Sequence, residues 1–594
     1  MKILFDAEGD GLFPTRLWCF SLIDIDTREI TEYGPKDIEA GLKHLQKADV
    51  LIGHNIIGYD LPHIKRLYGV DFEGTKIIDT LVLSRLNNPI QEGLHSLQTW
   101  GVKMGFPKVE HECWSQYTKG MQNRCTMDVR LNLKVYLYLI KNMQPFSQDC
   151  IDLEHEVAYI MRDQQIYGWL FDIRGAEQLL AKVQDELGTI EDRVHETFKP
   201  KQLVDKVVTP KIKKDGNLSR SGLRPEEFEA VELSGNRSPF NRYYTQVFNL
   251  SSRSQIALWL QDFGWKPTVF TENSKAEHKK DKSKSLKPKM DETVLEGIKG
   301  IPEADLINDF LGVSKIRGFL ENWLDSVEED GRQHGHVNPM GAVTGRMSHS
   351  KPNLAQVPSK RKKFGMECRD LFTVPEGYTL LGMDAQGLEL RMLAHYMDKP
   401  SYTLTASTGD SKLGTDAHTV NMKAAGLTDR DQAKTMYYAL IYGAGDKKMG
   451  SIVGGGIQDG KLIKSNLFGE LPELEDLIYR AQAAAQRGYI RGIDGRLIRI
   501  RAVYSALNTL LQGGGAVIMK RALVILKSKA DKAGLDYHFV GNVHDEIQSE
   551  VADEHVEAFK LLALEAMVEA GEYYDMKCPM EGSVGIGSSW AETH

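Results

Sequence analysis

The sequence lacks any long hydrophobic run. Among its 594 residues, no uncharged apolar stretch approaches the roughly 20 residues needed to cross a bilayer. The first six residues, Met1–Asp6, already include a carboxylate, which argues against a signal peptide. The sequence therefore predicts a protein with no membrane association.

Paired cysteines and internal repeats are also missing. The six cysteines are scattered and form no C-x-x-C pair: Cys19, Cys113, Cys125, Cys150, Cys368 and Cys578. This distribution fits buried thiols in a reducing cytoplasm and disfavours a disulfide framework or a zinc ribbon.

An excess of positive charge is absent as well. The formal net charge is −8, with 41% hydrophobic and 26% charged residues. These values argue against a protein that simply coats nucleic acid. They allow an enzyme that separates basic grooves for phosphates from acidic clusters for metals. A chain of this length also requires several domains.

The first part of the chain reads as a compact α/β domain. Ile3–Phe5 and Trp18–Ile25 have the pattern of paired strands, and Val50–Gly53 is a further short apolar run. Leu61–Tyr68 and Leu131–Ile140 have helical spacing.

The middle of the chain changes character several times. Long amphipathic helices are expected from Ile151 to Phe198, with a break at Tyr167–Trp169. Phe198–Phe248 is rich in proline and glycine and reads as an irregular inserted lobe. Ser274–Met290 carries seven lysines and reads either as a solvated, mobile loop or as a tip that contacts phosphates. Helical patterning then resumes at Asp291–Ser326, and a mixed α/β pattern follows.

Carboxylates cluster in the N-terminal domain. Asp6 and Glu8 end a strand two residues apart and so face the same side. Asp60, Asp79 and Asp128 follow at later element boundaries. Hard oxygen ligands of this kind hold two Mg²⁺ or Mn²⁺ ions about 3.5–4 Å apart for phosphodiester hydrolysis.

A second set of carboxylates comes from two distant segments. An apolar strand delivers Asp384 at its end, with the Met383 carbonyl nearby. Further along, two apolar arms around a Gly-Asn turn predict a hairpin with Asp545 and Glu546 at its tip. Such carboxylates are useful together if the fold brings them around two metals that activate a primer 3′-OH and neutralise a triphosphate.

A helix between these segments has the composition of a nucleotide-binding surface. Arg430, Lys434, Tyr438 and Tyr442 are spaced by four and share one helical face. The face offers two cations to a triphosphate and two aromatic rings to the base and sugar. His418 is a candidate for an additional phosphate contact.

Together the three segments resemble motifs A, B and C of family A (polymerase I-like) DNA polymerases, including R-x3-K-x7-YG as Arg430, Lys434 and Tyr442-Gly443. Thr344–Arg346 with Pro352–Pro358 resembles the family's primer–template segment, and Ala506–Gln512 resembles its minor-groove helix. Other segments are similar to the replicative enzymes of short-tailed, T-seven-like phages: Asn338-Pro339, Asp494–Arg496 and Trp590–His594. The resemblance extends over essentially the whole chain.

This resemblance implies a role for each motif residue. Asp384 and Asp545 are the catalytic metal ligands, with Glu546 beside them, and Met383 adds its carbonyl. Glu389 and Tyr438 form a steric gate against a ribose 2′-OH, and Tyr438 implies ready use of dideoxynucleotides. The motif A position where a serine is common holds Gln386, from which we expect altered packing or minor-groove contact.

The resemblance also implies contacts with primer-template DNA. Shape reading in the minor groove needs donors that suit every base pair. The DNA-binding candidates are Arg346, Asn353, Gln356, Arg496, Asn508, Gln512 and His544. Thumb lysines and arginines should hold phosphates, which makes binding salt-dependent.

The N-terminal carboxylates resemble those of DnaQ-like (DEDD) 3′→5′ exonucleases. By that resemblance, the metal ligands are Asp6, Glu8, Asp60 and Asp128. The polymerase-linked branch usually has a tyrosine four residues before the last aspartate, and here that position is Arg124. A guanidinium cannot act as a phenol but can contact phosphate. The alternative is a domain kept as a scaffold with feeble activity.

The fold class that follows is α/β and α+β multidomain, with a DnaQ-like (ribonuclease H-like) exonuclease domain before a right-hand polymerase. The expected boundaries are 1–148 for the exonuclease domain, 149–334 for the thumb with a lobe at about 199–248, 335–400 and 489–594 for the palm, and 401–488 for the fingers.

The expected reaction is extension of a DNA primer with dNTPs, using two Mg²⁺ or Mn²⁺ ions per active site. The family implies host thioredoxin at the inserted lobe and a primase-helicase as partners. It also implies a phage-encoded protein in the cytoplasm of an infected bacterium.

Three other functions compete with this interpretation. The first is an exonuclease whose C-terminal half only binds primer-template; intact Asp384, Asp545, Arg430 and Lys434 argue against it. The second is a non-catalytic DNA-binding accessory protein, for which two carboxylate sets would be superfluous. The third is an RNA-making or RNA-copying enzyme, which Glu389 with Tyr438 disfavours.

Overall fold

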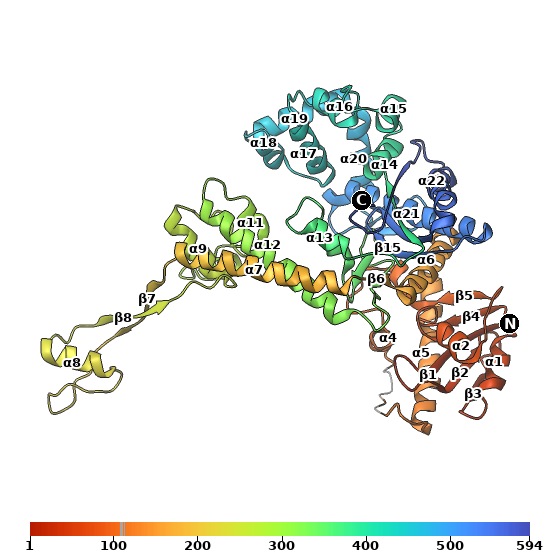
Figure 1. Ribbon diagram of the computed structural model, residues 1–594, viewed down its shortest axis with the longest axis horizontal. Helices are drawn as coiled ribbons and strands as arrows, with labels where there is room; N and C mark the ends of the chain where they lie inside the picture. Colours follow the sequence, from red (N-terminus) through yellow and green to blue (C-terminus); the bar gives the residue numbers. More distant parts are fainter. Residues whose placement is uncertain (107–110, 112, 594) are drawn as a thin grey trace. The chain divides into compact units, whose positions relative to one another are not determined.

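A computed structural model describes residues 1–106, 111 and 113–593, so the terminal His594 of the sequence motif lies outside the described residues (Figure 1). The chain forms two compact units. Unit 1 comprises Met1–Asp172, Ser326–Lys360 and Gly365–His594, and unit 2 comprises Ile173–Asp325 and Arg361–Phe364.

The N-terminal part of unit 1 is a five-stranded sheet in the order β3-β2-β1-β4-β5. Its strands are β1 (Lys2–Gly9), β2 (Leu17–Asp24), β3 (Ile30–Tyr33), β4 (Val50–Gly53) and β5 (Lys76–Asp79). The β1–β2–β3 pairs are antiparallel, and β4 and β5 join in parallel. Ile3, Leu4 and Phe5 are fully buried, because both faces of β1 are covered. The predicted strands are thus confirmed.

Helices flank this sheet and position its carboxylates. They are α1 (Ile38–Leu45), α2 (Asp60–Tyr68), α3 (Thr80–Asn87), α4 (Leu97–Lys103) and α5 (Lys119–Asn142). The Thr118 hydroxyl caps α5 by accepting from the Met121 N–H, and α5 packs on β1 and β2. Helix α6 (Gln148–Tyr167) begins after the Ser147 cap, slightly before the expected start at Ile151, and it ends at Tyr167, where the sequence predicts a break. Its residues belong to unit 1.

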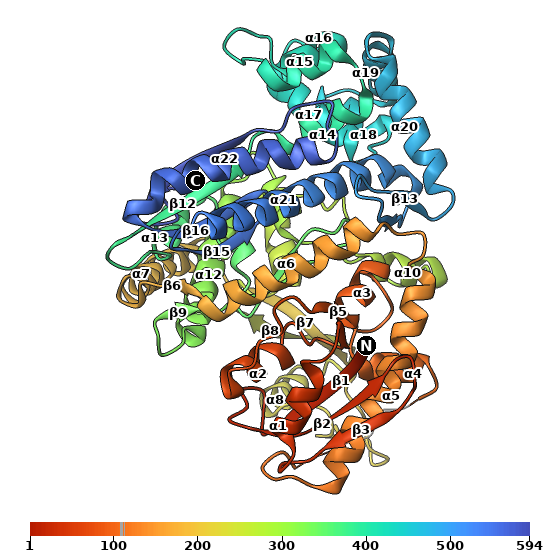
Figure 2. The same cartoon turned by 90° about the vertical axis from the view of Figure 1, so that its right-hand side faces the viewer.

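A second sheet in unit 1 joins segments far apart in the sequence. Its order is β15-β16-β12-β17, and every neighbouring pair is antiparallel. The strands are β12 (Tyr378–Ala385), β15 (Tyr537–Val543), β16 (Glu546–Ala552) and β17 (Gly582–Gly587). The long helices α21 (Ala506–Lys532) and α22 (Val556–Tyr573) pack against each other beside this sheet (Figure 2).

The predicted Gly-Asn turn is wrong. Gly541 and Asn542 lie inside β15, and the hairpin turns at His544 and Asp545. A β-bulge between Phe539 and Gly541 shifts the register, and a Cβ on Gly541 would come within 2.6 Å of the Trp169 ring. The glycine therefore serves packing against an aromatic ring, and the hairpin turn lies further along the chain than expected, at His544 and Asp545.

Along the sequence, a series of helices follows β12 before the other strands of its sheet are reached. In order they are α14 (Leu388–Met397), α15 (Pro400–Thr408), α16 (Ala417–Ala424), α17 (Arg430–Ile441), α18 (Asp446–Ile452), α19 (Ile457–Glu470) and α20 (Pro472–Ala485). Short elements complete unit 1: β6 (Trp169–Leu170), β9 (Arg332–Gln333), β10 (His336–Asn338), β11 (Ser348–Ser350), α13 (Gly365–Asp370), β13 (Tyr489–Arg491) and β14 (Leu497–Arg499).

One helical segment of the described residues, Val503–Lys532, is long and apolar enough to cross a membrane by length and composition alone. Its apolar window is 78% buried inside the protein, which is typical of the core helix of a globular domain.

Charged residues meet in the interior of unit 1. Lys520 Nζ on α21 donates to both carboxylate oxygens of Glu154 on α6, at 2.6 and 2.8 Å. Arg496 lies 2.7 Å from Glu154 and from Asp494, and its side chain is 4% exposed. The expectation that Arg496 contacts DNA is therefore wrong in this structure, because its guanidinium is consumed by a buried ion-pair network.

Unit 2 is built on two long helices, α7 (Ile173–Thr197) and α12 (Pro302–Ser326). The segment that connects them in the sequence includes a long two-stranded ribbon with a helix at its far end (Figure 1). The remaining elements are β7 (Lys201–Val208), α8 (Pro225–Ser234), β8 (Phe240–Gln246), α9 (Arg253–Leu260), α10 (Glu272–Lys280) and α11 (Glu292–Glu296).

Two expectations for this region are corrected. The 199–248 lobe is not irregular, because β7 and β8 pair in register from Lys201↔Gln246 to Val208↔Phe240. The lysine-rich stretch is not a loop throughout, since its first half belongs to α10, capped by the Thr271 hydroxyl. Lysine has good helix propensity, so a solvated composition does not exclude a helix.

Candidate active sites

Asp384 and Asp545 are brought together by the second sheet. Asp384 lies at the end of β12, in register with Glu546 at the start of β16. The Ala385 N–H donates to the Asp545 carbonyl at 3.1 Å, which places the two aspartates on adjoining strand ends. Both are partly exposed at the open end of the sheet. Carboxylates so placed are a donor set that fits Mg²⁺ or Mn²⁺.

Two other predicted site residues in these motifs, Glu546 and Met383, are buried. The Glu546 carboxylate accepts from the Trp590 indole N–H at 2.7 Å and is 4% exposed, so it braces the hairpin from behind. Met383 is fully buried and in register with both Ile547 and Val584. Its carbonyl therefore belongs to the interior of the sheet, and the expectation that it ligates a metal is wrong in this structure.

Helix α17 presents the predicted nucleotide-binding face. Asp429 caps the helix by accepting from the Asp431 and Gln432 N–H groups. Its buried side comprises Ala433, Met436, Tyr437, Leu440 and Ile441, and the opposite side holds the partly or fully exposed Arg430, Lys434, Tyr438 and Tyr442. As the four-residue spacing predicts, these four side chains share one face of the helix.

The beginning of this face is fixed by ion pairing. Arg430 donates to Asp416, the cap of α16, at 2.7 Å. Burial opposes ionisation of Asp416, yet hydrogen bonds from Arg430 and Thr419 lower its pKa to about 2. The His418 ring packs against Tyr437 and Tyr438, and burial together with nearby Arg430 lowers its pKa.

The second half of the face approaches the carboxylates. Burial raises the pKa of the Tyr438 phenol, and the negative charges of Glu389 and Asp545 add to the effect. Arg346 pairs with Glu389 at 3.0 Å. The predicted gate residues Glu389 and Tyr438 therefore lie near each other and near the hairpin tip.

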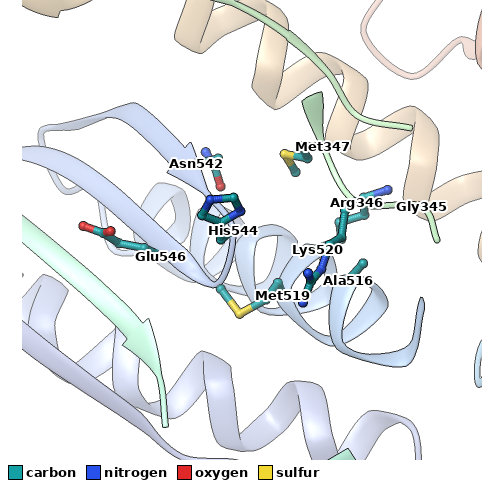
Figure 3. A pocket seen from close by; sticks show the side chains of 9 residues that line it. All are labelled: Gly345, Arg346, Met347, Ala516, Met519, Lys520, Asn542, His544 and Glu546. Atoms are coloured by element: carbon teal, nitrogen blue, oxygen red, sulfur yellow. The ribbon is translucent and has the colours of Figure 1, made fainter. Parts of the chain in front are cut away.

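A small pocket lies beside the β15–β16 hairpin (Figure 3). Arg346, Met519, Asn542 and His544 are among its lining residues. In Figure 3 the Glu546 carboxylate points away from His544 and Arg346. His544 is exposed and has a φ of 59°, because it forms the tight turn of the hairpin.

The other predicted DNA contacts are distributed around this centre. Gln512 Nε2 donates to the Tyr442 hydroxyl at 3.4 Å, which links α21 to the end of α17. Asn353 and Asn508 each have a buried side-chain oxygen that lacks a hydrogen-bond partner among the described residues. Gln356 ends a 3-10 turn at Leu354–Gln356.

The N-terminal sheet assembles a separate acidic site. Oxygens of Asp6, Glu8 and Asp128 lie within 4.8 Å of one another, and this group is the candidate metal cluster of the described residues. Asp60 is adjacent, with its Oδ1 accepting from the Ala7 N–H at 3.2 Å. Burial, with the nearby charge of Glu8, raises the Asp60 pKa to about 8.

Asp79 does not join this cluster. Its carboxylate accepts from the N–H groups of Asn55, Ile57 and Leu81, and it is 2% exposed. It therefore holds the loop after β4 against α3, and its role is structural.

Two functional candidates escaped the sequence analysis. Leu12 and Phe13, just past Glu8, are 83% and 84% exposed. Their loop is held by the Tyr59 hydroxyl, which donates to the Gly11 carbonyl at 2.6 Å. The available signal was an apolar pair between Gly11 and Pro14, in a segment with the composition of a loop. Exposed apolar side chains beside an acidic site suit the stacking of bases.

The fold and the polymerase site define a right-hand polymerase. A solved structure, the "POL domain of Pol1 from M. smegmatis complex with DNA primer-template and dNTP", superimposes with a TM-score of 0.76 at 20% identity. It covers 99% of this chain and 95% of that one. The family model "DNA polymerase family A" matches residues 230–592. The chain belongs to this family and is a DNA-directed DNA polymerase.

Relatives extend the similarity to the whole chain. The DNA-directed DNA polymerase of Escherichia phage T7 is 30% identical over all of both chains, and that of Enterobacteria phage T3 is 29% identical over the same extent. The thermostable DNA polymerase I of Thermus filiformis is 30% identical over 58% of this chain and 42% of its own. The predicted family and multidomain fold class are thus confirmed.

Proposed function

We propose that this polymerase extends a DNA primer by two-metal phosphoryl transfer at Asp384 and Asp545, with Mg²⁺ or Mn²⁺ as the ions. The register between β12 and β16 carries the proposal, because it sets these aspartates side by side at an accessible strand end. The bound ions would lower the pKa of the primer 3′-OH and neutralise the triphosphate. Activity should therefore disappear with EDTA and return with excess Mg²⁺.

The chain's own residues would bind and orient the substrates. Arg430, Lys434 and His418 would hold the triphosphate, and the Tyr442 ring would support the template-paired base. Arg346 and His544, which line the small pocket, would contact the primer terminus together with Gln512. The palm then comprises 335–400 and 489–594, the fingers 401–488, and the thumb lies within 149–334. Primer extension on a labelled duplex tests this arrangement.

Tyr438→Phe is expected to lower the relative use of ddNTPs about 10- to 100-fold, with dNTP incorporation close to normal. The phenol is half-buried beside Glu389 and Asp545 and can donate where a dideoxynucleotide lacks its own hydroxyl. Losing one such hydrogen bond costs about 1–3 kcal/mol. Single-nucleotide incorporation of ddNTP against dNTP measures the ratio, and an unchanged ratio contradicts the assignment.

We further propose a 3′→5′ exonuclease at Asp6, Glu8, Asp60 and Asp128, which would remove mispaired primer ends. Its support is the clustering of carboxylates within 4.8 Å, a donor set suited to hard divalent cations. The bound ions would activate water and stabilise the leaving oxygen. Leu12 and Phe13 would contact the terminal bases, which must be unpaired to reach the carboxylates.

Host thioredoxin is the partner we propose for the 199–248 lobe. The β7–β8 ribbon and α8 expose an unusual number of apolar side chains for so small an element: Val204, Val207, Leu233, Tyr243, Tyr244 and Val247. Capture of thioredoxin by the full chain, with longer products in its presence, is the expected result. Unchanged product length and no capture contradict it. We also propose a primase-helicase partner and action in the cytoplasm of a phage-infected bacterium, and the phage origin of the relatives supports the second of these proposals.

A further inference from the structure

The exonuclease carboxylates already contact a cation that belongs to the chain. Arg124 on α5 donates from Nε to Glu8 Oε1 at 3.1 Å. The same nitrogen lies 3.9 Å from Asp128 Oδ2, one helical turn along. Both carboxylates belong to the cluster that also includes Asp6. The guanidinium thus lies at the side of the site where two of the proposed metal ligands meet.

Burial and an aromatic contact hold this guanidinium in place. The Arg124 side chain is 17% exposed, and those of Glu8 and Asp128 are 11% and 3% exposed. The Trp114 ring lies 4.8 Å from the guanidinium carbon and adds a cation–π contact. Ion pairs in such surroundings are screened less than surface pairs, so this contact keeps its electrostatic strength at ordinary salt concentrations.

A divalent cation bound between Glu8 and Asp128 needs the oxygens that Arg124 faces. Like charges this close repel one another, and an arginine stays charged at every accessible pH. We propose that Arg124 competes with divalent cations for Glu8 and Asp128, so that the guanidinium sets the metal requirement of the exonuclease site. This proposal rests on the proposed exonuclease function.

The chemistry of arginine also specifies what the displaced side chain does. A guanidinium has five donors and no acceptor, so it cannot orient an attacking water by accepting its proton. It can pair with two phosphate oxygens at once. A DNA strand end entering the site therefore offers Arg124 a replacement partner and frees Glu8 for the metal. Binding of the metal at Glu8 and binding of the DNA strand end at Arg124 therefore favour each other.

The test measures metal binding directly, in full-length protein carrying Asp384→Ala and Asp545→Ala so that the polymerase site does not contribute. Free Mn²⁺ is titrated by electron paramagnetic resonance. Arg124→Gln is expected to tighten Mn²⁺ binding at least about tenfold, the change for one lost charge-assisted contact. Arg130→Gln, an exposed position on the same helix, controls for net charge and should stay within about twofold of the parent.

Two further variants separate the outcomes. Arg124→Lys keeps the charge and should bind Mn²⁺ with intermediate affinity, which also guards against a folding defect in Arg124→Gln. Equal affinities for Arg124→Gln and Arg130→Gln would overturn the proposed competition alone. If Glu8→Gln leaves Mn²⁺ binding unchanged, the cluster is not a metal site. In that case the exonuclease assignment fails together with the inference.

Discussion

Asp384→Ala is expected to reduce primer extension by a factor of about 10³ or more, because losing a carboxylate proposed to hold the metal ions would remove several kcal/mol of charge stabilisation. Asp384 and Asp545 adjoin through the β12–β16 register, so they should act as one unit. Asp545→Ala and the double variant should therefore be no more than slightly worse than Asp384→Ala. Single-turnover incorporation of one dNTP provides the measurement.

The control for this experiment is Glu376→Ala, an exposed position before the other end of β12. It removes a carboxylate near the same strand and should leave extension unchanged. Asp384→Ala should still degrade primer and should bind primer-template with nearly normal affinity. Retention of more than a tenth of the extension rate in Asp384→Ala would show that the assigned pair is not the catalytic centre.

Asp6→Ala is expected to slow removal of a mismatched 3′ nucleotide by about 10³-fold without affecting extension, since it deletes one of the carboxylates proposed to hold the ions. The measurement is the shortening of a labelled, mispaired primer in the absence of dNTPs. Mispaired ends should then persist, and products made with biased dNTP pools should carry more errors.

Asp26→Ala, in the exposed turn between β2 and β3, is the matched control for Asp6→Ala. Asp26 lies in a turn that joins two strands of the same sheet, and the Asp26→Ala enzyme should digest primer at the normal rate. Digestion by Asp6→Ala at a rate near that of the control would place the nuclease elsewhere or reveal a contaminant. Absence of digestion in both wild type and control would support the scaffold alternative for this domain.

Local patterns predicted most of the elements that carry the sites. Strand β1 was placed correctly by its short apolar run, which is typical of a strand buried on both faces, and helix α17 by its four-residue periodicity, which reflects one buried side. The hairpin was placed, but its turn was not. Gly541 reads as a turn residue, and only its packing against Trp169 explains why a glycine is needed inside a strand.

Other predictions failed where charge alone guided them. Arg496 reads as a DNA contact, yet its partners Glu154 and Asp494 bury it. Ser274–Met290 reads as a solvated loop or a phosphate-contacting tip, yet α10 begins upstream at the Thr271 cap and extends into this segment as far as Lys280. For Arg496 the sequence reports a charge and says nothing about which distant residue it meets. For the lysine-rich segment it reports exposure to solvent, which does not specify the backbone conformation.

By itself the sequence determined the class of enzyme, the order of its motifs and the residues of each acidic set, because these are local and combinatorially specific. The family resemblance predicted that Asp384 and Asp545 meet, but only the tertiary structure gave the strand register that joins them, and it alone paired Arg124 with Glu8 through the packing of α5 on β1. Such pairings depend on the geometry of elements distant in the chain, for which the amino-acid pattern at either site carries no signal.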